Sequence, residues 1–213
     1  MITEERMSAY LLSLETPEAG MLAELELYAK EHDIPIVRKE TAAFLRVLMK
    51  IRRPRRVLEV GTAIGYSGIL LARELPEGGK LVTIENYEPR ICKAKENFAR
   101  SGLNGQIVLM EGDAAEILPS LTEPFDFIFM DAAKGQYMNF FPEVLRLLPK
   151  DGVLVSDNVF QDGDTLESRY AVPRRDRTIH ARMREYLYTL KHTNGLTTAI
   201  LPVGDGVAVS VKE

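Results

Sequence analysis

The spacing of apolar residues along this 213-residue chain changes at Pro54. Before that point, apolar residues such as Leu22 and Leu25 recur at helical intervals, so we predict that residues 1–53 are helical, with an interruption at Pro35. After it, short apolar runs of strand length alternate with amphipathic stretches of helical length. The predicted strands are 57–60, 81–84, 107–110, 125–130 and 152–155, and the predicted helices are 67–75, 89–101, 114–120 and 137–148.

This alternation predicts the class of fold. Strands that are apolar on both faces and separated by helices are typical of a parallel sheet covered by helices, and the right-handed crossover rule favours a doubly wound topology. Two further strand-like runs, 196–202 and 206–211, are separated by only three residues, which requires antiparallel pairing. We therefore predict an α/β fold with a doubly wound, mostly parallel, seven-stranded sheet, N-terminal helices and a C-terminal antiparallel hairpin.

Composition and domain organisation are those of an ordinary globular protein. We find no repeat or linker, so we predict one domain over 1–213, with a helical cap (1–53) and an α/β core (54–213). The chain is 46% hydrophobic and 27% charged. No apolar stretch approaches the roughly 18 residues of a membrane helix, and the N-terminus lacks the pattern of a secretory signal. A lone cysteine, Cys92, fits a reducing compartment, so we expect a cytoplasmic protein without membrane contacts.

The first predicted strand runs into a loop with two glycines, Gly61 and Gly65, and a helix follows. Glycine allows a sharp turn and a close approach to a ligand, and the next helix presents unpaired N–H groups. A dinucleotide site would require the spacing G-x-G-x-x-G, whereas this loop has G-x-x-x-G preceded by Glu59. An acid there would repel a phosphate but suits a cationic amino acid group. The loop therefore favours S-adenosylmethionine over NAD.

Acidic residues also follow the next two strands. Glu85 is placed to accept hydrogen bonds from a ribose diol, and Asp113 with Ala114 follows the third strand, where an adenine edge would lie. Each motif has a plainer reading, since glycine can serve turn geometry alone and Asp113 with Glu116 forms a capping box. Three such features at the ends of three successive strands nevertheless favour a nucleotide-like ligand, because doubly wound folds bind ligands at that edge.

The fourth and fifth strands lead to oxygen ligands. Asp131 follows the fourth strand, and Asp157 and Asn158 follow the fifth. Two carboxylates and an amide oxygen suit Mg²⁺ or Mn²⁺, although an Asp-Asn pair after a strand also suits an ordinary turn. Zinc is disfavoured because the three histidines show no ligand spacing and Cys92 stands alone. We expect the histidines to be surface or packing residues.

Residues 57–67, together with Glu85 and Asp113, resemble the class I S-adenosylmethionine-dependent methyltransferases, which have a Rossmann-like fold. With Asp131, Asp157, Asn158 and the run 203–206, the chain is similar over nearly its whole length to the metal-dependent O-methyltransferases, the group of the catechol and caffeoyl-CoA enzymes. The resemblance implies these cofactor-binding positions: Glu59 and Gly61 at the methionine part, Ser67 at its carboxylate, Glu85 at the ribose, Asp113 and Ala114 at the adenine, Val37 closing over the cofactor, and also Asp131.

The same resemblance favours the metal over the turn. It implies that Asp131, Asp157 and Asn158 hold Mg²⁺ or Mn²⁺, which chelates two neighbouring substrate oxygens and lowers the pKa of a hydroxyl. Asp131 and Lys134 are the implied catalytic residues, with Lys134 accepting the proton or stabilising the oxyanion. The plainer alternative for Lys134 is a solvated lysine at a helix start. A protein that binds S-adenosylmethionine as a sensor, without chemistry, is disfavoured by this intact set.

Arginines bear on the acceptor. The net charge of −4 argues against bulk attraction to nucleic acid but not against a local patch. Six arginines lie within sixteen residues, and a second cluster precedes the first strand. They suit phosphate contacts, but solvated helix faces paired with Asp176 and Glu185 explain them equally well. The first group is Arg169, Arg174, Arg175, Arg177, Arg182 and Arg184, and the second is Arg52, Arg53, Arg55 and Arg56.

The segment 168–190 resembles the bacterial tRNA 5-hydroxyuridine methyltransferases, which form 5-methoxyuridine at the wobble position of the anticodon. This implies a tRNA anticodon loop as partner. The 5-hydroxyl and 4-carbonyl of the base are neighbouring oxygens, and bases of such a loop can be splayed into a pocket. Tyr170 suits either stacking on a base or plain packing. The alternative is a small-molecule catechol or caffeoyl-type enzyme. By family resemblance we also expect a homodimer, with the N-terminal helices covering the partner subunit.

Overall fold

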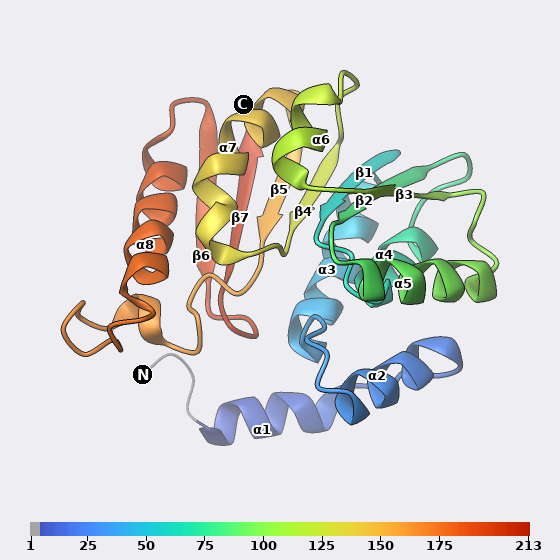
Figure 1. Cartoon of the computed structure of the whole chain (residues 1–213), viewed down its shortest axis with the longest axis horizontal. Coiled ribbons are helices and arrows are strands. Elements are labelled where there is room, and N and C mark those ends of the chain that lie inside the picture. The colour runs from blue at the N-terminus through green and yellow to red at the C-terminus, as the bar shows by residue number, and fades with distance from the viewer. Residues whose placement is uncertain (1–4) are drawn as a thin grey trace.

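The computed structural model describes residues 5–213, in which seven strands form one sheet flanked by helices (Figure 1). The order across the sheet is β3-β2-β1-β4-β5-β7-β6. The strands are β1 (Arg56–Val60), β2 (Lys80–Glu85), β3 (Ile107–Glu111), β4 (Phe127–Met130), β5 (Val153–Ser156), β6 (Leu196–Leu201) and β7 (Val207–Lys212).

Strand pairing confirms the predicted topology. The first five strands are parallel, with Val57 of β1 aligned with Leu81 of β2 on one side and Phe127 of β4 on the other. β7 pairs antiparallel with both β5 and β6. The C-terminal hairpin therefore inserts its second strand next to the parallel sheet and leaves its first strand at the edge. One strand is shorter than predicted, since β4 begins at Phe127 although Phe125 is also buried.

Helices cover both faces of the sheet (Figure 1). Successive residues of a strand point to opposite faces, so Val57 packs in one core and Leu58 in the other. The core containing Val57 is formed with α2 (Met21–Glu31), α3 (Lys39–Arg52), α4 (Tyr66–Arg73) and α5 (Glu88–Ser101). The core containing Leu58 is formed with α6 (Ala114–Ser120), α7 (Tyr137–Leu147) and α8 (Arg177–His192).

Two helical predictions were incomplete. Residues 1–53 are not one continuous helical region: α1 (Glu5–Leu14), α2 and α3 are separated by 15–20, which contains Pro17, and by 32–38, which contains Pro35. Residues 1–4 lie outside the described part. The helix α8 was not predicted, because its many arginines conceal an apolar stripe of buried Met183, Tyr186 and Leu190. Two short 3-10 helices also occur, η1 (Lys134–Gln136) and η2 (Asp164–Leu166). Within residues 5–213, none of the helices is both long and apolar enough to cross a membrane.

Candidate active site

A cavity of about 530 Å³ opens where the parallel strands end, at the edge predicted for ligand binding. This volume lies in the range of small-molecule pockets. The loops after β1, β2, β3 and β4 line it, and the segment 35–37 before α3 borders it from another side. Of the positions predicted for the cofactor, seven line this cavity: Val37, Gly61, Ser67, Glu85, Asp113, Ala114 and Asp131.

The glycine loop is packed tightly against the end of β4. Gly61 has a φ of +105°, and a Cβ built there would lie 2.2 Å from the backbone oxygen of Asp131. Gly65 begins α4 with a φ of +86° and lies over the ring of Phe98. No side chain caps α4, so its first N–H groups face the cavity side without a side-chain acceptor. Only glycine allows both approaches.

Glu59 does not line the cavity but is fully buried directly behind the loop. Its Oε2 accepts a hydrogen bond of 2.6 Å from the hydroxyl of Thr83, which is itself 2.6 Å from the hydroxyl of Thr62. Its Oε1 has no hydrogen-bond partner within residues 5–213. Burial raises the pKa of Glu59 to about 7, against opposing hydrogen bonds from Ser67 and Thr83. One oxygen of this carboxyl is therefore buried without a hydrogen bond, behind the wall of the cavity.

Glu85 is fixed by backbone N–H groups at the end of β2. Its Oε2 accepts from the N–H of Ala63 at 2.9 Å, and its Oε1 accepts from those of Asn86 and Tyr87 at 3.1 and 3.0 Å. A carboxylate has about four acceptor positions, so about one remains for a ligand hydroxyl. The loop after β1 is thereby tied to the end of β2, which fixes the shape of the cavity between them.

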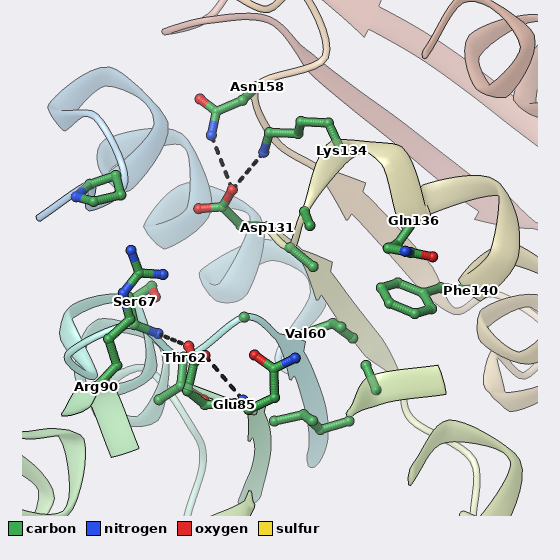
Figure 2. A pocket seen from close by; sticks show the side chains of 18 of the residues that line it. Val60, Thr62, Ser67, Glu85, Arg90, Asp131, Lys134, Gln136, Phe140 and Asn158 are labelled. Carbon is green, nitrogen blue, oxygen red and sulfur yellow. Dashed lines mark hydrogen bonds and ion pairs between the residues drawn. The ribbon is translucent and has the colours of Figure 1, made fainter. Parts of the chain in front are cut away.

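Asp113 has both of the roles considered from the sequence, because it lines the cavity and caps α6. Its Oδ1 accepts from the N–H of Ala115 at 2.8 Å. Gln136 and Phe140, from η1 and α7, line the same cavity at the side away from Ser67 (Figure 2). The sequence had not pointed to these two, because an amphipathic stretch with apolar positions predicts only packing.

The predicted metal ligands come together at the ends of β4 and β5. The side-chain amide of Asn158 donates to Oδ1 of Asp131 at 3.0 Å, and the ammonium of Lys134 lies 2.9 Å from the same oxygen (Figure 2). Asp157 is fully buried beside them; its Oδ1 accepts from the N–H of Asn158, and its Oδ2 has no partner among the described residues. Burial, and then the charge of Asp131, raise the pKa of Asp157 to about 7.

This set fits a hard divalent cation. It offers two carboxylates and a side-chain amide, and one buried carboxylate oxygen is unsatisfied. If the side-chain amide of Asn158 is rotated by 180°, its oxygen replaces its NH2 group on the side of Asp131. The surrounding hydrogen bonds determine which of the two orientations the amide takes. Residues 5–213 contain no cluster of three or more His, Cys, Asp or Glu side chains arranged for a metal. Any metal here therefore depends on the amide together with Asp131 and Asp157.

Lys134 is held by a residue that the sequence had not indicated. The hydroxyl of Tyr137 is 3.1 Å from the Lys134 ammonium and donates to the carbonyl oxygens of Met130 and Asp157 at 3.0 and 3.1 Å. Tyr137 is buried, and burial raises the pKa of its hydroxyl well above the usual value. Lys134 is thus a fixed, partly buried cation rather than a freely solvated lysine. The one sequence feature that could have indicated Tyr137 is its position three residues after Lys134.

The segment 35–37, which borders the cavity and contains Val37, is connected through Arg38 to the loop that follows β5. Arg38, next to Val37, forms an ion pair of 2.7 Å with Asp162, whose N–H donates to Asp205 at 2.8 Å. The loop contains three non-glycine residues with positive φ, at Asn158, Gln161 and Asp162. Conformations of this kind are uncommon for such residues. The loop that carries Asn158 is therefore held in a restricted conformation by contacts with Arg38 and with the β6–β7 turn.

The six arginines after β5 divide into three groups. Arg177, Arg182 and Arg184 each bond a backbone oxygen, and the bond from Arg182 to Gly135, of 2.8 Å, ties α8 to η1. Arg175 pairs only with the adjacent Asp176. Arg169 and Arg174 are exposed and have no side-chain hydrogen bond or ion pair with residues 5–213. Tyr170 between them is 88% exposed, so the packing alternative for it is wrong.

The second arginine cluster, Arg52 to Arg56, lies away from the candidate site, although it is close to the glycine loop in sequence. Arg56 begins β1 and pairs with Glu123, and Arg52 donates to the carbonyl of Asp151. Residues that precede a parallel strand lie at the amino edge of the sheet, whereas the cavity lies at the carboxyl edge. Proximity in sequence to the glycine loop was misleading, because the whole of β1 separates the two.

Comparisons with known proteins agree with this geometry. A family model described as O-methyltransferase matches residues 11–213. The catechol O-methyltransferase of Niastella koreensis is 41% identical over 135 residues, which are 61% of this chain and 61% of that protein. The caffeoyl-CoA O-methyltransferase of Eucalyptus gunnii is 29% identical over 98% of this chain and 88% of its own length. The chain thus aligns with about three-fifths of the first relative and most of the second.

Solved structures show the same fold. An O-methyltransferase from Bacillus cereus in complex with SAH has a TM-score of 0.86 at 28% identity, with 100% of both chains covered. TomG from Streptomyces achromogenes, an O-methyltransferase involved in tomaymycin synthesis and solved in complex with SAM, has a TM-score of 0.85 at 30% identity, covering 100% of this chain and 99% of that one. With the family model matching residues 11–213, the chain belongs to the O-methyltransferase family.

Proposed function

We propose that the protein transfers the methyl group of S-adenosylmethionine to an acceptor oxygen held at a divalent metal ion, and that the acceptor is 5-hydroxyuridine at the wobble position of tRNA. One observation carries the proposal: a single cavity contains both the glycine loop with Glu85 and the polar cluster of Asp131, Lys134 and Asn158. The SAM-bound and SAH-bound structures of the two solved relatives support the choice of cofactor.

The cofactor residues have distinct tasks in this proposal. Gly61 and Gly65 allow the backbone to approach the methionine part, and the acidic side chain of Glu59 lies buried behind this loop, on the side proposed for the ammonium group. The remaining acceptor position of Glu85 takes a ribose hydroxyl. Asp113 and Ala114, at the start of α6, line the adenine side. Val37, which is 6% exposed, covers the bound molecule.

The acceptor side is organised by the polar cluster. Asp131, Asp157 and Asn158 would hold Mg²⁺ or Mn²⁺, and such an ion lowers the pKa of a neighbouring hydroxyl and binds adjacent oxygens. Lys134, fixed by Tyr137 and Asp131, is positioned to accept the hydroxyl proton or to stabilise the oxyanion. Asn158 and Asp157 orient the acceptor toward the cavity that holds the methyl donor. Alignment of oxygen and methyl group supplies much of the rate acceleration.

The exposed segment 168–176 supports a nucleic acid acceptor. It follows the loop that carries Asn158 and leads into α8, which is bonded to η1 through Arg182. In Figure 1 it forms the orange loop next to α8. Arg169 and Arg174 are available for phosphate, and exposed Tyr170 is available for stacking on a base. A catechol-type small molecule is the second candidate, because the Niastella koreensis relative at 41% identity is a catechol O-methyltransferase.

One experiment separates these acceptors. The protein, Mg²⁺ and methyl-labelled S-adenosylmethionine are incubated with tRNA containing 5-hydroxyuridine and, separately, with catechol. We expect label in the tRNA, as 5-methoxyuridine, and loss of transfer in Asp157→Ala or when the metal is chelated. Label in catechol but not in tRNA would refute the tRNA acceptor, and unchanged transfer by Asp157→Ala would refute the metal site.

The proposed binding of tRNA by Arg169 and Arg174 can be tested against a matched pair of arginines elsewhere in the chain. The double variant Arg169→Glu with Arg174→Glu should weaken tRNA binding and reduce the slope of log K against log salt by about 1.5, because two phosphate contacts are lost. Arg53→Glu with Arg55→Glu makes the same change of charge at the opposite edge of the sheet, where both side chains are exposed. Equal effects of the two double variants would mean that only net charge is involved.

A further inference from the structure

We propose that Arg90 binds the carboxylate of the amino acid part of S-adenosylmethionine, a role that rests on the cofactor proposed above. Arg90 lies in the first turn of α5 and lines the same cavity as Ser67. In Figure 2 its guanidinium lies beside Ser67, at the end of the cavity opposite Gln136 and Phe140. Arg90 was not predicted from the sequence, since it belongs to no motif around the glycine loop.

Helix packing accounts for the position of Arg90. The face of α5 that contacts the glycine loop contains Asn97, whose side-chain amide donates to the carbonyl of Ile64 at 2.8 Å, and Phe98, whose ring lies under Gly65. Arg90 precedes Asn97 by seven residues, which is two turns of helix. It therefore lies on the same face, at the end of α5 that reaches the cavity.

The charges around the cavity single out Arg90. Three acids line it, Glu85, Asp113 and Asp131, and two cations, Lys134 and Arg90. Lys134 is already paired with Asp131 at 2.9 Å. No ion pair within residues 5–213 includes Arg90, which is half-buried and contacts the ring of Tyr87 at 5.6 Å from its centroid. A half-buried guanidinium in an acidic cavity, without a carboxylate partner in the described chain, is suited to an anionic ligand group.

The amino acid part of S-adenosylmethionine supplies such a group. The buried acid Glu59 lies behind the glycine loop, near the place proposed for the ammonium group, but the carboxylate next to that group must be neutralised elsewhere. Ser67, the residue expected at the carboxylate, offers only a neutral hydroxyl, and the uncapped start of α4 offers N–H groups without a full charge. A guanidinium can donate two parallel hydrogen bonds to a carboxylate. Arg90 thus completes the site for the zwitterion.

Calorimetric binding without methyl acceptor tests this role. The ligands are S-adenosylmethionine and its decarboxylated form, which differ only in the carboxylate. Arg90→Gln should weaken binding of S-adenosylmethionine by about 10- to 100-fold, as expected for a charged hydrogen-bonded pair, and change binding of the decarboxylated form by less than about twofold. Arg90→Lys keeps the positive charge but not the two parallel donors, so its affinity for S-adenosylmethionine should lie between those of the wild type and Arg90→Gln. Arg73→Gln, an exposed arginine at the end of α4 outside the cavity, is the matched control.

The outcomes distinguish this role from the proposed function. If Arg90→Gln weakens both ligands equally, or neither, Arg90 does not bind the carboxylate, although the cofactor proposal stands. If Arg73→Gln reproduces the selective loss, the effect is long-range charge and the role of Arg90 is refuted. If the wild-type protein binds neither S-adenosylmethionine nor S-adenosylhomocysteine, the proposed function and this role both fail. Unchanged thermal melting of Arg90→Gln establishes that its fold is intact.

Discussion

Gly61→Ala tests whether the close approach of β1 to β4 shapes the site. The added methyl group would lie 2.2 Å from the backbone oxygen of Asp131 and 2.8 Å from its carbonyl carbon, with φ at +105°. Backbone atoms cannot rotate away as a side chain can, so the ends of the two strands must separate. Asp131, which lines the cavity and belongs to the proposed metal site, would move with its own carbonyl group.

The loss of folding stability expected for Gly61→Ala is the sum of two free-energy costs. A positive φ costs a residue with a Cβ about 1–2 kcal/mol, and overpacking in a closely packed region costs about 1–3 kcal/mol. Their sum is about 2–5 kcal/mol, which for a protein of this size lowers the melting temperature by about 4–20 °C. Gly78→Ala is the control, because Gly78 also has a positive φ, of +77°, but nothing lies within 4 Å of its Cβ. Gly78→Ala should incur only the cost of the positive φ, which lowers the melting temperature by about 2–8 °C.

Thermal melting of the three proteins, with calorimetric titration of S-adenosylhomocysteine, makes the comparison. We expect Gly61→Ala to melt below Gly78→Ala and to bind the ligand more weakly than wild type, whereas Gly78→Ala binds normally. If Gly61→Ala melts no lower than Gly78→Ala, the contact between Gly61 and the Asp131 backbone does not restrict the structure, and our account of the glycine loop is wrong.

Three further predictions concern pH, metal and assembly. Burial raises the pKa of Glu59 and Asp157 to about 7, above the value of about 4 in an unfolded chain. Preferential protonation of these two groups in the folded state stabilises the fold fully at low pH, and this stabilisation is lost as pH rises from about 4 to about 7. The melting temperature in metal-free buffer should therefore fall over that interval, and a flat profile would contradict this prediction. Added Mg²⁺ at pH 8 should raise the melting temperature of the wild type but not of Asp157→Ala, and an equal rise in both would place the ion elsewhere. The apolar side chains of Leu11 and Leu14 on α1 are 44% and 62% exposed, so we expect a second copy of the chain to cover them, and light scattering should show a dimer that Leu11→Asp with Leu14→Asp converts to monomer.

The sheet was predictable because its signals are local. Each parallel strand is a short apolar run, and the three-residue connection between the last two runs allowed only one kind of pairing. The residues that line the cavity were also predictable where they lie at the end of a strand or within two residues of it, as Glu85, Asp113 and Asp131 do. At such positions, the order of the chain determines the place in space.

Residues brought to the site by helix packing were not predictable in this way. Arg90 reaches the cavity only because Asn97 and Phe98 dock α5 against the glycine loop. Tyr137 was equally hidden, since its hydroxyl finds Lys134 and two carbonyl oxygens only after β4, β5 and α7 have packed. The arginines at 52–56 show the converse error, because closeness in sequence placed them at the wrong edge of the sheet. Long-range packing is the information that a single sequence lacked.

The ion pair between Arg38 and Asp162 has a consequence for turnover kinetics. In the proposed function Val37 covers the bound cofactor, so we expect exchange of spent cofactor to require opening of the segment that contains Val37, which would separate this pair of 2.7 Å. The two side chains are 49% and 85% exposed, so the pair contributes at most about 1 kcal/mol and is screened by salt. Product release should therefore become faster as ionic strength rises, even with an uncharged acceptor. A rate limited by release would then increase in salt, whereas the proposed binding of tRNA should weaken.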